Sequence, residues 1–342
     1  MEAYRVAIVG ATGLVGRAMA QILAERNFPL RELVAIASPR SAGKQILFKE
    51  QTVTVQAISA ELFKGIDLAL FSAGGATSRE WAPIAASQGT IVIDNSSAWR
   101  RDPDVPLCIP EVNPRCLSKR PKGIIANPNC STMQMLVALK PIHDHATIRR
   151  IVVSTYQAIS GAGINSIDAL KAQNQALLND SDLDTQILKG QLAGNLLMHW
   201  TPDADSGYSE EELKMVFETQ KIFADPGIRV SPTAVRVPVI NGHAEAVAIE
   251  TEKPISAAEA KALLAKAPGV ELCDDFANGL YPQPCHADGR DAVMVGRIRN
   301  DIGNQSGVQM WIVADNLRKG AALNTVQIAE TLIATKQIEP AA

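Results

Sequence analysis

Short apolar runs alternate with helical or loop segments through the first 130 residues, and this alternation constrains the fold more than any other feature. Each run has the length of a buried strand, and the segment after the first run carries apolar residues at helical spacing. Strands that alternate with helices are typical of a parallel sheet of the doubly wound α/β class. The runs are YRVAIV (4–9), LVAIAS (33–38), LALFSAG (68–74), TIVIDNSS (90–97) and GIIANPN (123–129).

The pattern changes after residue 130, where the apolar segments become longer, β-rich and partly alternating. Alternation of this kind predicts a second, α+β domain with a largely antiparallel sheet. The predicted strands are 149–160, 231–240, 243–252 and 292–300.

Three later segments have helical patterns, and two of them begin with a capping box, in which a serine precedes a glutamate by three residues. The third has apolar residues at helical spacing and is expected to be the last helix of the fold. The predicted helices are 209–223 (Ser209 with Glu212), 256–267 (Ser256 with Glu259) and 320–338.

Composition suits a two-domain globular protein, since 46% of the 342 residues are hydrophobic and 20% are charged. The net charge of −3 and the lack of a basic run argue against nucleic acid or an acidic membrane as partner, so we expect small-molecule partners. No signal peptide and no run of about 18 apolar residues is present, which makes the cytoplasm the expected location.

The five cysteines are scattered and odd in number, so we expect no disulfides. No C-x-x-C or H-E-x-x-H motif occurs. The closest histidine pair, His143 and His145, lies at i,i+2, where helical side chains diverge. We therefore expect no metal site.

Three glycines follow the first predicted strand with G-x-x-G-x-x-G spacing: Gly10, Gly13 and Gly16. A glycine turn that leads into a helix can hold a pyrophosphate on backbone N–H groups and the helix dipole. The alternative is an ordinary tight turn between strand and helix, without a ligand.

The end of the second predicted strand normally selects the cofactor ribose, and here it reads ASPRSAGK. Ser38, Arg40 and Ser41 stand where an acidic residue would accept a 2′-hydroxyl. These groups would complement a 2′-phosphate, so the sequence favours NADP over NAD.

Cys130 follows an apolar run and precedes STMQMLVALK, which has the pattern of a buried helix face. Unpaired N–H groups and the dipole at a helix N-terminus stabilise a thiolate, which is the setting for covalent catalysis. Cysteine is also among the most buried residue types, so an inert packing thiol is the alternative.

The motif NPNCST (127–132), together with GATGLVG (10–16), resembles the aspartate-semialdehyde dehydrogenase family. The stretch 180–205 follows the family pattern only loosely. Other matches cover nearly the whole chain: DNSSAWR (94–100), PDVPLCIPEVN (103–113), STYQAISGAG (154–163), EEELKMVFETQKI (210–222), RVPVINGHAEAV (236–247) and DNLRKGAALNTVQIAE (315–330).

The resemblance implies a Rossmann-like NADP-binding domain with a mostly parallel sheet, from residues 1–131 and 319–342, and a catalytic and dimerisation domain, 132–318. It implies a cytoplasmic homodimer that reduces aspartyl phosphate to aspartate semialdehyde through a cysteine thioester and releases phosphate. Such a reaction serves the biosynthesis of lysine (through diaminopimelate), threonine, methionine and isoleucine.

The resemblance also implies the site residues. Cys130 would be the nucleophile and His243 its base, while Asn129 and Gln157 would orient the acyl group. The substrate would be bound at its carboxylate by Arg236, at its amine by Glu211, and at its phosphate by Lys214 and Arg100. The cofactor would contact Gly10, Thr12, Gly13, Leu14, Val15, Gly16, Ser38, Arg40, Ser41, Ser160, Gly161 and Asn316.

Each of these roles has a simpler structural alternative. Glu211 and Lys214, at i,i+3, could form a surface ion pair. His243 could be a surface residue at the end of a strand. Two other functions are also open. A relative could act on N-acetyl-glutamyl phosphate or an acyl-CoA, but NPNC rather than NPGC weighs against it. A non-catalytic nucleotide-binding paralogue conflicts with the intact Cys130, His243, Gln157 and Arg236.

Overall fold

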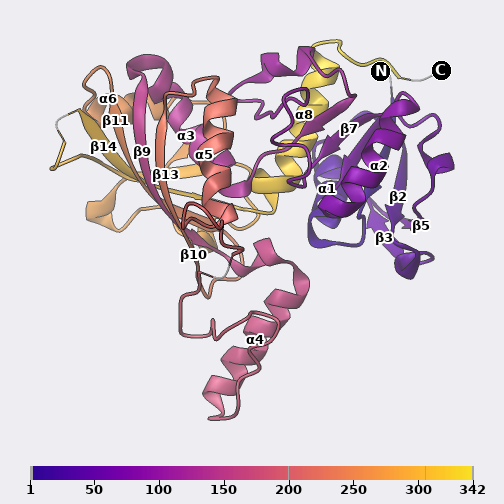
Figure 1. The fold of residues 1–342 in the computed structure, drawn as a ribbon, viewed down its shortest axis with the longest axis horizontal. Helices are drawn as coiled ribbons and strands as arrows, with labels where there is room; N and C mark the ends of the chain where they lie inside the picture. The colour runs from indigo at the N-terminus through magenta and orange to yellow at the C-terminus, as the bar shows by residue number, and fades with distance from the viewer. Residues whose placement is uncertain (1–2, 199, 305, 341–342) are drawn as a thin grey trace. The chain divides into compact units, whose positions relative to one another are not determined.

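The computed structural model describes residues 3–198, 200–304 and 306–340, and the chain divides into two compact units (Figure 1). The first unit is Met1–Pro128 with Ala321–Ala342, and the second is Asn129–Gly320. These divisions fall within three residues of the domain boundaries drawn from the sequence. Asn129 and Cys130 consequently belong to the second unit, where the helix that begins at Cys130 lies.

The first unit is built on a six-stranded sheet in which all neighbouring strands are parallel, as predicted. In sheet order the strands are β5 (Gln56–Ala57), β2 (Leu30–Ala37), β1 (Tyr4–Val9), β6 (Leu68–Phe71), β7 (Ile91–Asp94) and β8 (Ile124–Ala126). Strands β1, β6, β7 and β8 are almost wholly buried because helices cover the apolar runs, which accounts for the lack of alternation in the sequence.

Helices α1 and α8 pack against each other beside this sheet (Figure 1). The predicted closing helix is shorter than expected, because a π-helical turn, Arg318–Ala322, precedes it. Helix α2 and a small hairpin were not predicted. The remaining elements of the first unit are α1 (Leu14–Glu25), α2 (Gly75–Ser87), α8 (Leu323–Ala334), β3 (Gln45–Phe48) and β4 (Gln51–Thr54).

The second unit contains a six-stranded mixed sheet. The three central pairings are antiparallel, as expected, but the outer pairs β10–β9 and β12–β13 are parallel. Strands β12 and β14 were missed in the sequence. In sheet order the strands are β10 (Arg229–Arg236), β9 (Ile148–Gln157), β11 (His243–Thr251), β14 (Gly307–Ala314), β13 (Val293–Asn300) and β12 (Val270–Leu272).

The helices of the second unit include the two that begin with capping boxes, and both boxes form as predicted. The central helix, α3, packs against β9, β11, β13 and β14. Glu212, besides capping α5, accepts a hydrogen bond from the backbone of Ala234 (2.9 Å) and so fastens α5 to β10. The helices are α3 (Cys130–Ala146), α4 (Ile164–Leu178), α5 (Glu210–Phe223), α6 (Ala257–Leu264) and α7 (Pro284–Ala287).

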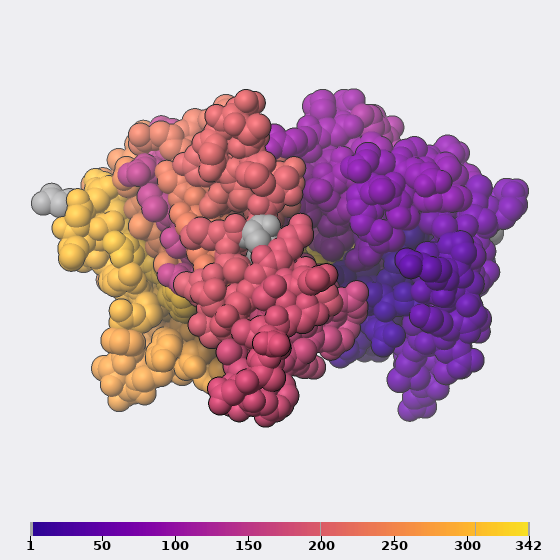
Figure 2. Space-filling view, turned by 60° about the horizontal axis from the view of Figure 1, so that its bottom comes forward, coloured from indigo at the N-terminus to yellow at the C-terminus, as the bar shows by residue number. Residues whose placement is uncertain are grey.

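Helix α4 and the chain after it form an arm, residues 164–198, that extends from the mixed sheet (Figure 1) and comes forward in Figure 2. The buried side chain of Gln173 joins the two parts of the arm. Its amide donates to the carbonyls of Asp184 and Gly190 and accepts from the N–H groups of Leu192 and Ala193. The helix-free part of the arm is therefore tied to α4 by one fully used amide.

Candidate active site

Cys130 is the first residue of α3, as the sequence predicted, and Asn129 caps the helix. The Asn129 Oδ1 atom accepts from the N–H groups of Ser131 (3.1 Å) and Thr132 (3.3 Å). Cys130 is partly exposed, whereas the residues that follow it in the helix are buried. A partly exposed thiol at the positive end of a helix is suited to react, unlike a buried packing cysteine.

Two acidic residues on α5 accept hydrogen bonds from the capping residue, Asn129. Glu218 Oε2 accepts from the Asn129 N–H (2.7 Å), and Glu211 Oε1 accepts from the Asn129 side-chain amide (2.9 Å). They lie seven residues apart and so share one helix face. Glu218 is fully buried and was missed in the sequence, although its spacing from Glu211 in a predicted helix was a usable signal.

Glu211 is buried, and it also accepts hydrogen bonds from Gln157 Nε2 (3.1 Å) and Lys214 Nζ (3.0 Å). Burial alone would raise its pKa. The charge of Lys214 and the three hydrogen bonds outweigh burial and lower the pKa of Glu211 to about 2. The Glu211–Lys214 pair is thus no surface ion pair, and Glu211 is an ionised carboxylate beside the Cys130 turn.

His243 begins β11 and is fully buried, so the interpretation as a surface histidine is wrong. Its Nδ1 accepts from the Ala158 N–H (3.0 Å), and its Nε2 has no hydrogen-bond partner among the described residues. Burial, and then the charge of Arg236, lower the pKa of His243 to about 3. The neutral ring must therefore carry its proton on Nε2, which makes Nε2 a hydrogen-bond donor.

Arg236 ends β10, and its Nη1 donates to the Ala158 carbonyl (2.7 Å). Arg236 is buried, which lowers its pKa, while the charges of Cys130 and Glu211 oppose that effect. Its Nε is buried without a hydrogen-bond partner in the described part of the chain. A buried guanidinium with an unsatisfied N–H can bind an anion such as a carboxylate.

Two glycines leave room around these groups. A Cβ atom on Gly161 would lie 3.4 Å from both Arg236 Nη1 and His243 Nε2, so Gly161 borders the space between them. A Cβ atom on Gly320 would lie 2.9 Å from the Cβ of Cys130, too close to be accommodated. Gly320 is a second neighbour of Cys130 that sequence analysis missed.

Ser160 and Asn316 support the loop that joins β10 to β11. Asn316 Nδ2 donates to Ser160 Oγ (2.8 Å), and Ser160 Oγ donates to Asn241 Oδ1 (2.8 Å). Asn316 Oδ1 accepts from the Gly242 N–H (2.9 Å). Three residues expected to contact the cofactor, Ser160, Gly161 and Asn316, therefore lie next to Arg236 and His243.

A buried acid lies behind His243 on the same strand. Glu245 is fully buried beside Gln134, and Gln134 Nε2 donates to the His243 carbonyl (3.3 Å). Burial raises the pKa of Glu245 well above its ordinary value, so the folded protein favours the neutral form of this side chain.

The first unit contains the predicted glycine turn. Gly10 has φ +92°, and a Cβ atom there would lie 2.5 Å from the Ser72 carbonyl oxygen; one on Gly16 would lie 2.2 Å from the Gly10 oxygen. Gly13 caps α1, so the N–H groups of Leu14 and Val15 lie in its first turn, next to the half-exposed Thr12. The turn is shaped as a nucleotide-binding loop requires.

The predicted ribose selector lies at the same edge of this sheet. Ser38 and Arg40 are exposed, and Ser41 is half-buried, on a 3-10 turn just after β2, the strand next to β1. Arg100 is buried after β7, where its Nη2 donates to the Asn95 carbonyl (3.0 Å).

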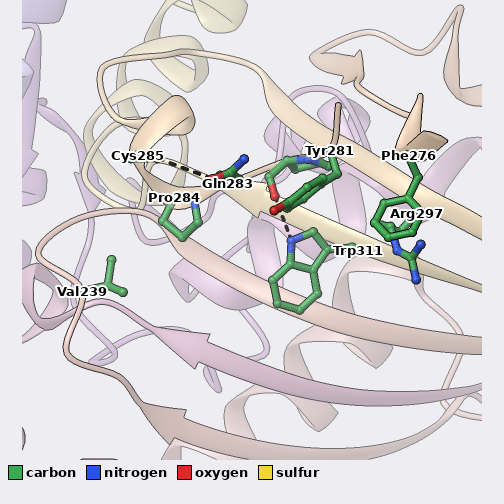
Figure 3. A pocket seen from close by; sticks show the side chains of 9 residues that line it. Val239, Phe276, Tyr281, Gln283, Pro284, Cys285, Arg297 and Trp311 are labelled. Atoms are coloured by element: carbon green, nitrogen blue, oxygen red, sulfur yellow. Dashed lines mark hydrogen bonds between the residues drawn. The ribbon is translucent and has the colours of Figure 1, made fainter. Parts of the chain in front are cut away.

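The second unit has a separate aromatic cavity of about 580 Å³, in which Phe276, Tyr281 and Trp311 surround open space (Figure 3). None of the predicted site residues lines it. The Arg297 guanidinium lies over the Phe276 ring, 3.7 Å from its centroid. Across the described residues, no helix is long and apolar enough to cross a membrane, and no group of three or more His, Cys, Asp or Glu could hold a metal.

Known protein families match both units. A model described as the semialdehyde dehydrogenase NAD binding domain matches residues 5–120, and one described as the semialdehyde dehydrogenase dimerisation domain matches residues 139–319. An aspartate-semialdehyde dehydrogenase from Aquifex aeolicus is 57% identical, over 96% of this chain and 98% of its own length. Aspartate-semialdehyde dehydrogenase 2 from Vibrio cholerae is 52% identical, over 97% and 98%.

Solved structures agree with these matches. The structure of aspartate semialdehyde dehydrogenase II from Vibrio cholerae, complexed with ASA, has a TM-score of 0.95 and 50% identity and covers 98% of this chain and 99% of its own. A Candida albicans aspartate semialdehyde dehydrogenase with NADP is 24% identical with a TM-score of 0.75, over 98% and 99%, and shares the fold.

We expect Glu218→Leu to disturb the Cys130 turn, because it leaves the Asn129 N–H buried without an acceptor, at a cost of about 1–3 kcal/mol in the free energy of unfolding. Glu218→Gln keeps an acceptor oxygen. Iodoacetamide labelling with peptide mapping should show slower modification of Cys130 in Glu218→Leu than in Glu218→Gln, with the exposed Cys285 as internal reference. Equal rates in both variants and in an exposed control, Glu210→Gln, would contradict a role for the Glu218–Asn129 hydrogen bond in the reactivity of Cys130.

We also expect a pH-dependent gain of stability from Glu245→Gln. Burial raises the folded pKa of Glu245, so its contribution to stability is fully present below the unfolded pKa of about 4.3 and is lost as pH rises from there through the folded pKa. Urea unfolding should therefore show Glu245→Gln gaining about 1.4 kcal/mol on wild type for each pH unit between the unfolded and the folded pKa of Glu245. A difference that stays constant with pH, or equals that of exposed Glu252→Gln, would rule out a neutral Glu245.

Proposed function

We propose that this chain, which belongs to the aspartate-semialdehyde dehydrogenase family, interconverts aspartyl phosphate and aspartate semialdehyde with NADP(H) through a thioester on Cys130. One observation carries the proposal: a partly exposed thiol at a helix N-terminus lies in one unit with an ionised Glu211, a buried Arg236 and a neutral His243. These groups suit covalent catalysis on a substrate that bears an amine and a carboxylate.

In the biosynthetic direction, the Cys130 thiolate attacks the acyl carbon of aspartyl phosphate, and the C–O bond to phosphate breaks as the C–S bond forms. NADPH, when bound, would supply the hydride for reduction of the acyl carbon. The resulting thiohemiacetal oxyanion then collapses, which breaks the C–S bond and frees the aldehyde and the Cys130 thiolate. Asn129 and Gln157, tied to each other through Glu211, hold the turn around the reacting sulfur.

His243 acts on the oxygen of the reacting carbon. The family resemblance implied a base that takes a proton from the thiol or the hemithioacetal, but the hydrogen bond from the Ala158 N–H to Nδ1 supports a different first role. The neutral ring offers its Nε2–H to the oxyanion, as an oxyanion-hole donor. The low pKa of His243 favours this role, because the ring stays neutral and is not drawn into an ion pair with the substrate.

The substrate is held by charge at both ends. Arg236 binds the carboxylate, which supplies an acceptor for its unpaired Nε, and Glu211 binds the amine. Lys214 and Arg100 bind the phosphate. Because Lys214 is paired with Glu211 in the free protein, binding of the amine would release Lys214 for the phosphate.

The cofactor is proposed to bind at the glycine turn of the first unit. The positions of Gly10 and Gly16, where a Cβ atom has no room, let the backbone of this turn approach a pyrophosphate closely. Ser38, Arg40 and Ser41 at the same sheet edge supply a charge and hydroxyl groups for the 2′-phosphate of NADP.

A relative that acts on N-acetyl-glutamyl phosphate is the alternative enzyme. Acetylation removes the positive amine, and the ionised Glu211 would then have no cationic partner on the substrate. The test is NADPH formation from aspartate semialdehyde, phosphate and NADP, run beside N-acetyl-glutamate semialdehyde, with Cys130→Ser as the inactive control. Preference for the acetylated substrate, or turnover by Cys130→Ser, would overturn the assignment.

Replacement of Arg40 by alanine should raise the Michaelis constant for NADP about tenfold to a hundredfold, because a charge-assisted contact to the 2′-phosphate is lost. The constant for NAD in the same variant should change little and serves as the control. If the Michaelis constants for NADP and NAD rise alike, Arg40 supports the loop and does not bind the 2′-phosphate.

We further propose a cytoplasmic homodimer that serves the biosynthesis of lysine, threonine, methionine and isoleucine. The second unit matches a dimerisation domain, and Val152 and Tyr156 of β9 are exposed on the open face of its sheet, with Trp311 packed on Tyr156. A second copy would cover this apolar face. Analytical ultracentrifugation should give twice the protomer mass, and Tyr156→Glu should shift it toward one protomer. A monomeric wild type would contradict the dimer.

A further inference from the structure

The end of the arm is joined by main-chain hydrogen bonds to β10, the strand that ends at Arg236. Leu197 and Arg236 pair through two bonds, from the Leu197 N–H to the Arg236 carbonyl (3.1 Å) and from the Arg236 N–H to the Leu197 carbonyl (2.8 Å). The end of the arm is thus fastened to the residue proposed to bind the substrate carboxylate.

Three residues after Leu197, Trp200 lies against the Arg236 side chain. The Arg236 Cζ atom is 4.9 Å from the centre of the Trp200 ring, within the range of a cation–π contact. Among the described residues the guanidinium donates one hydrogen bond, from Nη1 to the Ala158 carbonyl, and a single bond leaves a planar group free to pivot. An aromatic ring against it restricts that rotation.

We propose that Trp200 is a positioning residue that holds the Arg236 guanidinium in the orientation needed for bidentate binding of the substrate carboxylate. Two parallel N–H···O bonds form only when guanidinium and carboxylate share a plane, so the orientation of Arg236 sets the affinity. The buried Nε of Arg236, without a partner in the described residues, is the donor that this orientation makes available. The inference rests on the proposed function of the same site.

The first experiment is steady-state kinetics on Trp200→Leu and Trp200→Phe. Trp200→Leu should raise the Michaelis constant for aspartate semialdehyde about threefold to tenfold, the range of a cation–π contact, and leave kcat and the constants for phosphate and NADP within about twofold. Trp200→Phe keeps an aromatic face and should recover most of the affinity. An unchanged constant for the semialdehyde, or an equal rise in all constants, would overturn the proposal.

The chain offers a matched control in Phe276, which makes a second arginine–aromatic contact with Arg297 at the aromatic cavity (Figure 3). Phe276→Leu removes a contact of the same kind and should leave every constant unchanged. In an Arg236→Lys background the guanidinium is absent, so Trp200→Leu should add little to the loss caused by Arg236→Lys. An equal effect of Trp200→Leu in both backgrounds would mean that Trp200 acts independently of Arg236.

A binding assay separates this inference from the proposed reaction. Succinate, a carboxylate probe that needs no turnover, should raise the melting temperature of wild type and Phe276→Leu more than that of Trp200→Leu or Arg236→Lys. If wild type shows this pattern but does not oxidise the semialdehyde, the proposed function fails and the role of Trp200 stands. If wild type oxidises the semialdehyde while Trp200→Leu matches it in both assays, the role of Trp200 fails alone.

Discussion

The hydrogen bonds that two buried carboxylates of α5 make to Asn129 are the constraint on which the candidate site depends. Glu218 fixes the backbone of Asn129 and Glu211 its side chain, and Asn129 in turn caps the helix that Cys130 begins. Buried charges are tolerated only where hydrogen bonds or opposite charges compensate for lost solvation. The capping box of α5 and its link through Glu212 to β10 keep these acids in register with the turn.

The charged groups around the Cys130 turn set the ionisation states of Glu211 and His243 in opposite ways. Lys214 keeps Glu211 ionised, while burial, and then the charge of Arg236, keep His243 neutral. The site therefore combines a fixed anion, a fixed cation and an uncharged hydrogen-bond donor within one unit. A polar substrate could be bound at two points and activated at a third without any of these protein groups changing its charge.

Local patterns in the sequence were sufficient to predict the features that depend on neighbouring residues. The parallel sheet, both capping boxes and the start of a helix at Cys130 follow from such patterns, and the structure confirms them. Glu218 and Gly320 were missed because their importance arises from contacts with residues distant in sequence. The parallel outer pairs of the mixed sheet were missed for the same reason, since pairing direction depends on how the chain crosses between strands.

Ala158 links the anion-binding arginine to the neutral histidine entirely through its backbone, with its N–H bonded to His243 and its carbonyl to Arg236. Its methyl group takes no part in either bond. A mutational scan that trims or exchanges side chains would therefore score this position as one of ordinary packing, however strongly the chemistry depends on it. Only an exchange that alters the backbone itself, such as proline or a backbone ester in place of the amide, would reveal the connection.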